Sequence, residues 1–287
     1  MSSSAPVLFD SHMHTPLCKH AVGHPRSYAR TGFERGLKGV TFTCHSPMPE
    51  RWSHAVRMEP EKLGYYIRLI EQTAAELEGE FAVRLGLESD WFPGMEPWLE
   101  QLHRRARFHY ILGSVHYHVA EYQEMFFHGD IRAFQEGYFG HLADSAESGL
   151  FDALSHPDLV KNAAPDSWDF AAIRSAIESA LDRIAATGVA LELNTSGLNK
   201  SVAEMNPGIE MLRMIRSREI PVVLGSDAHV PQRVGADFEF ALEQLAEAGF
   251  TTVSQFENRE REDLAISHAL ASLRDTTMSS AEASLQP

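Results

Sequence analysis

Short apolar runs alternate along this chain with longer stretches of helical character. Each run is short enough to be a buried strand rather than a helix. Seven runs have this form: Val7–Asp10, Gly39–Thr43, Phe81–Leu87, Tyr110–Val115, Phe151–Leu154, Val189–Leu193 and Pro221–Leu224. Six further stretches predict helices, many of them followed by a glycine: Glu59–Glu78, Pro97–Arg107, Ile131–Gly149, Trp168–Thr187, Glu204–Ser217 and Asp237–Ala248.

This alternation predicts an α/β fold of right-handed βαβ units with a mainly parallel sheet. The sheet is either closed as a barrel or open and doubly wound, and periodicity does not choose between the two. No linker or low-complexity tract divides the interior. We therefore predict a single domain over residues 1–274, followed by a polar, disordered tail from Asp275 to Pro287.

The composition limits the classes of partner. The chain has 287 residues and a formal net charge of −15, which argues against a nucleic-acid surface. No apolar run approaches the roughly 18 to 20 residues of a membrane span, and Met1 to Pro6 lack an apolar signal core. We expect a cytosolic protein with neither a nucleic acid nor a membrane as partner. Its two cysteines, Cys18 and Cys44, exclude a disulfide framework.

The fifteen histidines change this picture, because neutral imidazole is the commonest metal ligand in proteins. Six of the seven runs are followed by a histidine, glutamate or aspartate. In chain order these residues are His12, His14, His20, His45, Glu88, His116, His156, Asp227 and His229. The carboxyl ends of parallel strands share one face, so we expect these nine side chains to converge there.

Nine candidate ligands are too many for one ion but suit two or three divalent ions, such as zinc, iron or manganese, with Glu88 or Asp227 bridging. A single strand-end histidine such as His156, taken alone, can equally be an ordinary packed residue that binds no metal. We interpret the other eight histidines in that ordinary way: His24, His54, His103, His109, His118, His128, His141 and His268, with contact to a substrate left open for His54. Cys44 is predicted to be a buried thiol, and a position near metal is left open for Cys18.

Several segments together resemble the PHP (polymerase and histidinol phosphatase) superfamily in order and spacing, over about residues 8–250. They are Asp10-Ser-His-Met-His14 with His20, Thr43-Cys-His-Ser-Pro47, Gly86-Leu-Glu88, Gly113-Ser-Val-His116, His156-Pro-Asp158 and Gly225-Ser-Asp-Ala-His229. Three segments are most similar to the superfamily's histidinol-phosphate phosphatases: Gly113-Ser-Val-His-Tyr117, His156-Pro-Asp-Leu-Val-Lys161 and Glu192-Leu-Asn-Thr-Ser-Gly-Leu198.

The resemblance implies a distorted barrel of seven parallel strands, a trinuclear metal centre and hydrolysis of L-histidinol phosphate in histidine biosynthesis. It implies three ligand sets: His12, His14, Glu88 and Asp227; Glu88, His116 and His156; and His20, His45 and His229. Cys44 departs from the aspartate that is common in relatives, which puts the orientation of His45 in doubt rather than its role as a ligand.

From the chemistry of phosphate esters we expect Glu88 and Asp227 to be catalytic, with hydroxide attacking phosphorus from between the metals that share Glu88. The proton donor to the leaving alkoxide stays unassigned between Asp227 and water. Substrate-binding candidates are Lys161, Arg233, Asn194 and His45. The alternatives are a phosphoesterase of the same family acting on a nucleotide or sugar phosphate, and a non-catalytic polymerase module.

Overall fold

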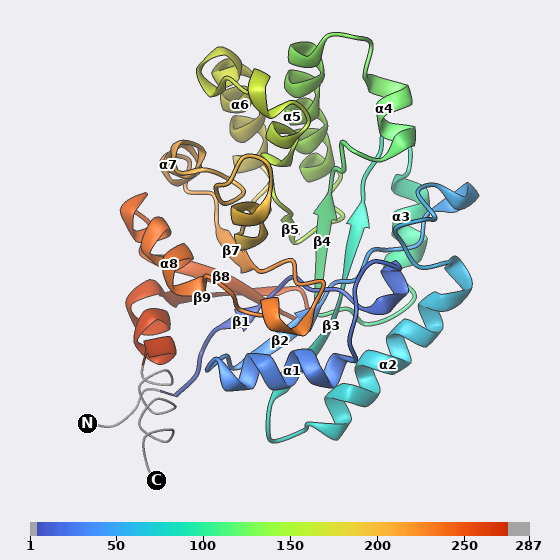
Figure 1. Cartoon of the computed structure of the whole chain (residues 1–287), viewed down its shortest axis with the longest axis vertical. Helices are drawn as coiled ribbons and strands as arrows, with labels where there is room; N and C mark the ends of the chain where they lie inside the picture. The colour runs from blue at the N-terminus through green and yellow to red at the C-terminus, as the bar shows by residue number, and fades with distance from the viewer. Residues whose placement is uncertain (1–4, 275–287) are drawn as a thin grey trace.

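The computed structural model describes residues 5–274, in which strands and helices alternate around a parallel sheet (Figure 1). Neighbouring strands follow the order of the sequence, and every pairing from β1 to β8 is parallel. The strands are β1 (Phe9–Asp10), β2 (Gly39–Phe42), β3 (Ala82–Asp90), β4 (Tyr110–Ser114), β5 (Ala153–Leu154), β6 (Ala190–Asn194), β7 (Val222–Gly225), β8 (Thr252–Glu257) and β9 (Glu260–Ala265). All seven predicted strands are present.

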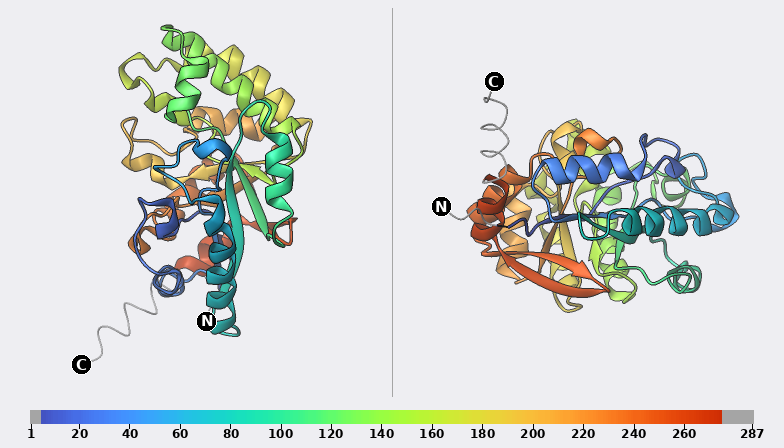
Figure 2. Two further views of the ribbon diagram at one scale, coloured as in Figure 1. Left: turned by 90° about the vertical axis from the view of Figure 1, so that its right-hand side faces the viewer. Right: turned by 90° about the horizontal axis from the view of Figure 1, so that it is seen from below.

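The helices lie around the outside of the strands (Figures 1 and 2). They are α1 (Pro25–Glu34), α2 (Leu63–Glu76), α3 (Glu96–His103), α4 (Ala120–Phe126), α5 (Ile131–Glu147), α6 (Phe170–Ala185), α7 (Ile209–Ser217) and α8 (Phe238–Glu247), with a further helical stretch at residues 266–274. Six of them match the predicted stretches. The sequence pattern missed α1, in which Gly32 interrupts a short amphipathic stretch, and the seven-residue α4.

Backbone hydrogen bonds join the first strand to the seventh and close the ring. The N–H of Ser11 donates to the carbonyl of Leu224 (3.2 Å), and the N–H of His14 donates to that of Ala228 (2.9 Å). Met13 and Ala228 form a parallel bridge beyond the ends of β1 and β7. With β1 and β5 only two residues long, the ring is irregular. The predicted α/β fold is confirmed, and these bonds select the distorted barrel over an open sheet.

The antiparallel hairpin of β8 and β9 was not predicted, and it lies beside β7, with which β8 pairs (Figure 2). Phe256 joins a small cluster inside the ring, separate from the larger core under the helices: Tyr110, Leu112, Ala153, Ala190, Val223 and Phe256. The Phe256 and Tyr110 rings stack with their centroids 5.3 Å apart. Arg84 in β3 donates to the Phe256 carbonyl (2.8 Å) and so ties the hairpin to the opposite side of the ring.

The predicted tail, 275–287, lies outside the described residues, and the single-domain interpretation stays a prediction. Within residues 5–274, the structure contains no helix that is both long enough and apolar enough to cross a membrane.

We expect Phe256→Ala to lower the free energy of unfolding by about 3 to 5 kcal/mol, because it opens a cavity inside the barrel. The matched control is Phe240→Ala, whose side chain is 46% exposed and whose loss should cost about 0.5 kcal/mol or less. Urea unfolding of the two variants measures the difference. Equal, small losses would show that the hairpin does not support the barrel.

Candidate metal centre

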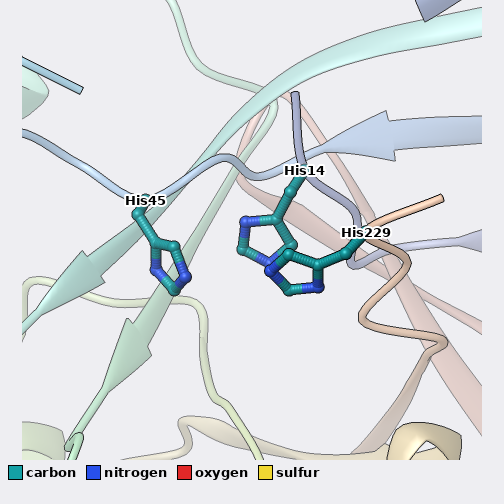
Figure 3. Close-up of side chains that lie close together, drawn as sticks. All are labelled: His14, His45 and His229. Atoms are coloured by element: carbon teal, nitrogen blue, oxygen red, sulfur yellow. The ribbon is translucent and has the colours of Figure 1, made fainter. Parts of the chain in front are cut away.

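The ends of the strands bring the predicted ligands to one side of the barrel, around a cavity of about 420 Å³. Figure 3 shows three of these side chains, His14, His45 and His229, which reach the same place from the segments that follow β1, β2 and β7. The His14 ring stacks on that of His229 at a centroid distance of 4.0 Å and lies 4.4 Å from that of His45. Convergence of the strand ends is therefore observed, as the parallel topology requires.

Glu88, fully buried in β3, lies at the centre of the first ligand set. Its Oε2 is 3.4 Å from His12 Nε2 and 3.6 Å from His14 Nε2. The same two nitrogens lie 3.6 and 3.1 Å from Asp227 Oδ1, and 3.2 Å from each other. Donors at bond lengths of about 2.0 to 2.2 Å from one tetrahedral ion lie about 3.3 to 3.6 Å apart, so this set has the dimensions of a metal site.

The other oxygen of Glu88 faces a second set. Glu88 Oε1 lies 3.4 Å from His116 Nε2 and 3.5 Å from His156 Nε2. Because the two carboxylate oxygens point at different imidazole pairs, one side chain can contribute a ligand to two neighbouring ions.

The third predicted set is looser. The rings of His20 and His229 stack at 4.5 Å, and the rings of His45 and His229 are 6.2 Å apart. His45 Nδ1 lies 2.8 Å from Glu88 Oε2. His45 therefore stands between the third set and the first.

Several buried atoms at the centre lack a hydrogen-bond partner: His14 Nδ1, His45 Nδ1, Glu88 Oε2 and His229 Nε2. The pair of His45 Nδ1 and Glu88 Oε2 is notable because the two atoms are only 2.8 Å apart and still do not form a hydrogen bond. Unpaired buried polar atoms are costly, and a shared divalent cation would satisfy these. Their residues thus fit a metal centre.

The electrostatics of the protein without metal point the same way. Burial raises the pKa of Glu88, but the imidazoles of His45, His12 and His116 outweigh it and hold that pKa well below its ordinary value. Burial likewise opposes charge on His116, yet Asp90 and Glu88 raise its pKa to about 10. The carboxylates are therefore ionised at neutral pH, as metal ligands must be.

Two carboxylates that the sequence interpretation missed orient two of the predicted ligands, His12 and His116. Glu192 Oε1 lies 2.7 Å from His12 Nδ1, and its Oε2 accepts the backbone N–H of His156 (2.9 Å). Asp90 Oδ1 lies 3.0 Å from His116 Nδ1. Both contacts leave Nε2 of the histidine directed at Glu88, which is how outer carboxylates fix metal-binding imidazoles. The signal for Glu192 was a charged residue inside the apolar run Val189–Leu193.

Three of the predicted substrate-binding residues do not line the cavity. Lys161 is fully buried, and its Nζ donates to Asp158 (2.9 Å), Glu204 (3.0 Å) and the Met205 carbonyl (2.8 Å), so no donor is left for a substrate.

Arg233 pairs with Asp237 (2.9 Å) and does not line the cavity. Asn194 is buried, with its amide donating to Glu192 and its carbonyl accepting from the Ser196 N–H, each at 2.9 Å. Of the four predicted substrate-binding residues, only His45 lines the cavity.

Other residues line the cavity instead, and these were not predicted. They are Tyr117, His118, Leu159, Asn162, Asn199, Lys200 and Ser201. Lys200 is the cation among them, and its Nζ lies 3.9 Å from Asp227 Oδ2. His118 was interpreted as an ordinary histidine and in fact faces the site, whereas His54 is exposed and does not line the cavity.

Comparison with known proteins gives consistent results. The PHP domain family matches residues 10–196. A protein of Deinococcus radiodurans named "Probable histidinol-phosphatase" is 41% identical over 258 residues, which cover 86% of this chain and 96% of that protein. The "Histidinol-phosphatase" of Bacillus subtilis is 30% identical over 82% of this chain and 98% of its own length.

A solved structure has the same fold. It is the histidinol phosphate phosphatase of Lactococcus lactis complexed with zinc, L-histidinol and phosphate. The TM-score is 0.76 at 21% identity, over 89% of this chain and 98% of that one.

In the metal-free protein we expect the His116 imidazole to stay protonated until the pH approaches about 10, against an ordinary pKa of about 6.5. The pairing should stabilise the metal-free fold fully below about pH 6.5, and this contribution should be lost as the pH rises through about 10. Asp90→Asn should lower the pKa of His116 by about one to three units.

Nuclear magnetic resonance of the imidazole nitrogens measures this titration. Asp263→Asn, on the β9 strand, is the control and should leave the His116 titration unchanged. A His116 that titrates near pH 6.5 in the unaltered chain would contradict the charge arrangement.

Proposed function

This chain belongs to the PHP family, and from that premise we propose that it hydrolyses L-histidinol phosphate to L-histidinol and phosphate. The observation that carries the proposal is the buried Glu88 carboxylate, with imidazole nitrogens 3.4 to 3.6 Å from both of its oxygens. The choice of ester is supported by the names of the two bacterial relatives and by the ligands of the Lactococcus structure.

We assign two or three divalent metal ions to the centre. Glu88 would give one oxygen to each of the first two sets: His12, His14 and Asp227 on one side, and His116 and His156 on the other. The third set comprises His20, His45 and His229. When bound, such ions lower the pKa of water to about 7 and neutralise charge on the phosphate. Zinc is the metal of the Lactococcus structure and the metal we propose first.

Asp227 has a second task besides its place in the first set. Its Oδ2 accepts the Ser196 hydroxyl (3.1 Å) and faces Lys200 across 3.9 Å. Burial raises the pKa of Asp227, but His12 and His14 outweigh burial and hold the pKa well below its ordinary value. Because the carboxylate is ionised, Asp227 acts as a hydrogen-bond and proton acceptor.

Lys200 takes the place that Lys161 and Arg233 were predicted to fill. It follows the 3₁₀ turn Thr195–Asn199 at the end of β6, and its side chain is 28% exposed at the cavity. A lysine ammonium in this position neutralises an outer phosphate oxygen as a point charge. The neighbouring side chains of Asn199 and Ser201 also line the cavity and offer hydrogen bonds to the phosphate.

Other residues that line the cavity suit the leaving group. Tyr117, His118 and Leu159 present rings and an apolar side chain, and Asn162 presents an amide. A cavity of about 420 Å³ accommodates a small ester rather than a polymer.

A panel of phosphate esters tests the choice of substrate. We expect kcat/KM for L-histidinol phosphate to exceed that for a nucleoside monophosphate and a sugar phosphate by at least about a hundredfold. A higher kcat/KM for either of the other esters would refute the substrate assignment but not the phosphatase activity. If zinc-, iron- or manganese-loaded protein hydrolyses none of the esters, the phosphatase activity itself is refuted.

We expect Glu88→Gln to lose at least one metal ion and nearly all hydrolysis, because a neutral amide is a poor bridge between two cations. Metal analysis and single-substrate kinetics on the same preparation measure both effects. The control is Glu257→Gln, which removes a surface carboxylate paired with Arg84. A Glu88→Gln variant that keeps all its metal and its activity would refute the assignment of Glu88 as a bridging ligand.

We expect Lys200→Ala to lower kcat/KM for a phosphate ester about tenfold to a hundredfold with the metal content unchanged, since it removes one charged contact to phosphate. Arg233→Ala is the matched control, because it removes a cation outside the cavity, and it should leave kcat/KM unaltered. If the two variants behave alike, Lys200 does not bind the phosphate.

A further inference from the structure

An aromatic ring protrudes from the surface near the end of α1. Phe33 is 62% exposed, the largest exposed fraction among the big apolar side chains of residues 5–274. The buried Phe81 ring meets it edge to face, with the two centroids 6.3 Å apart. Gly32 makes this arrangement possible, because a Cβ there would lie only 2.9 Å from the Phe81 ring. Phe33 therefore projects into water from a base that is itself apolar.

Two hollows flank the Phe33 ring, where α1 lies beside α2 (Figure 1). The first has a volume of about 510 Å³, and its apolar lining besides Phe33 consists of Ala29, Leu77 and Phe81. The second has a volume of about 680 Å³ and adds Pro6 and Leu37. A projecting ring and hollows that can take a ring thus belong to one patch, which we call the Phe33 patch.

This combination has the form of an isologous contact between two identical chains. In a two-fold symmetric pair, a residue of one copy contacts a second residue of its partner, and the reverse contact follows by symmetry. The ring of each copy can therefore enter the hollow of the other. Apolar patches with a polar rim mark interaction sites, and aromatic anchors at their centre carry much of the binding energy.

The charges around the Phe33 patch suit a second copy of this chain. With a net charge of −15, two copies repel each other over most of their surface. The two hollows, in contrast, are lined by three cations and two carboxylates: Arg26, Arg30, Lys38, Glu34 and Glu80. This patch is therefore a place where two acidic chains can meet without a surplus of negative charge.

Two of these charges can pair across the contact. Arg30 reaches only Glu34 of its own helix, at 2.8 Å, and these side chains are 80% and 56% exposed, so the pair contributes little. Glu80 is exposed, lines the same hollow as Arg30 and has no ion-pair partner among the described residues. Arg30 of one copy and Glu80 of the other thus have complementary charges at the edge of the hollow.

We propose that the chain forms a two-fold symmetric dimer through the Phe33 patch. Phe33 of each copy enters the hollow of the other, and Arg30 of each copy faces Glu80 of the other. Phe81 directly precedes β3, at the amino ends of the strands, whereas the metal centre lies at their carboxyl ends. The dimer therefore leaves the cavity open, and the proposal does not depend on the activity proposed above.

Sedimentation velocity of the unaltered full-length chain at micromolar concentration tests the dimer, and we expect a species of twice the mass of one chain. Phe33→Asp should raise the dissociation constant at least about thirtyfold, because it removes the central aromatic anchor. Phe33 is exposed, so the variant should fold. The matched control is Phe240→Asp, since Phe240 is 46% exposed and lines neither hollow; it should leave the dissociation constant unchanged.

An exchange of charges tests the symmetry of the contact. Arg30→Glu and Glu80→Arg should each weaken self-association, because each variant places like charges opposite one another. When the two variants are mixed, every facing pair has opposite charges, so a heterodimer should form.

A monomeric unaltered chain would overturn the proposal, whether another segment of the chain or a different protein then covers the patch. A dimer that Phe33→Asp does not weaken would overturn it as well, because the contact would then lie elsewhere. If the mixed charge variants form no heterodimer, Arg30 and Glu80 do not face each other and the proposed geometry is wrong.

Discussion

The structure depends on one buried carboxylate. Glu88 has no exposed surface, and nitrogens of five histidines lie 2.8 to 3.6 Å from its two oxygens: His12, His14, His45, His116 and His156. An isolated carboxylate in such a place would be very costly, so it must be matched by positive charge. Raised histidine pKa values supply part of that charge in the metal-free protein, and divalent ions supply it in the proposed enzyme.

The barrel serves this interaction by bringing the ends of four other strands, β1, β2, β4 and β5, to one carboxylate on β3. The ring closes through hydrogen bonds of residues 11–14 with residues 224–228. The predicted ligands His12 and His14 lie within the first of these two segments. Outer carboxylates then fix the rings: Glu192 on His12, and Asp90 on His116. Asp90 is held in turn by the buried Arg57, which also donates to the Ser46 carbonyl (2.9 Å). The loop after β2 is thereby connected to the imidazole of His116.

The sequence predicted the strands and the convergence of the nine candidate ligands because both follow from parallel topology. Side-chain direction does not follow from topology. Lys161 comes only five residues after His156 in the sequence, but its side chain turns inward to Asp158. Lys200 is farther in sequence from any predicted ligand, and yet it lines the cavity. The β8–β9 hairpin escaped prediction because β9 is mostly exposed and polar, so that it has no apolar run. Glu192 was missed because the role of a charged residue inside a buried strand can be inferred only when its partner, here His12, is known.

The net charge of −15 at first argues against an anionic substrate, but what a phosphate encounters is the local field. Much of the acidic charge near the site is already committed: Glu192 and Asp90 to histidines, Asp158 to Lys161, and Asp227 to His14. Two or three divalent ions would add roughly four to six positive charges behind these contacts. Lys200 lines the same cavity and adds a further positive charge. An acidic protein can therefore present a positive pocket, because its carboxylates act as ligands and partners rather than as free surface charge.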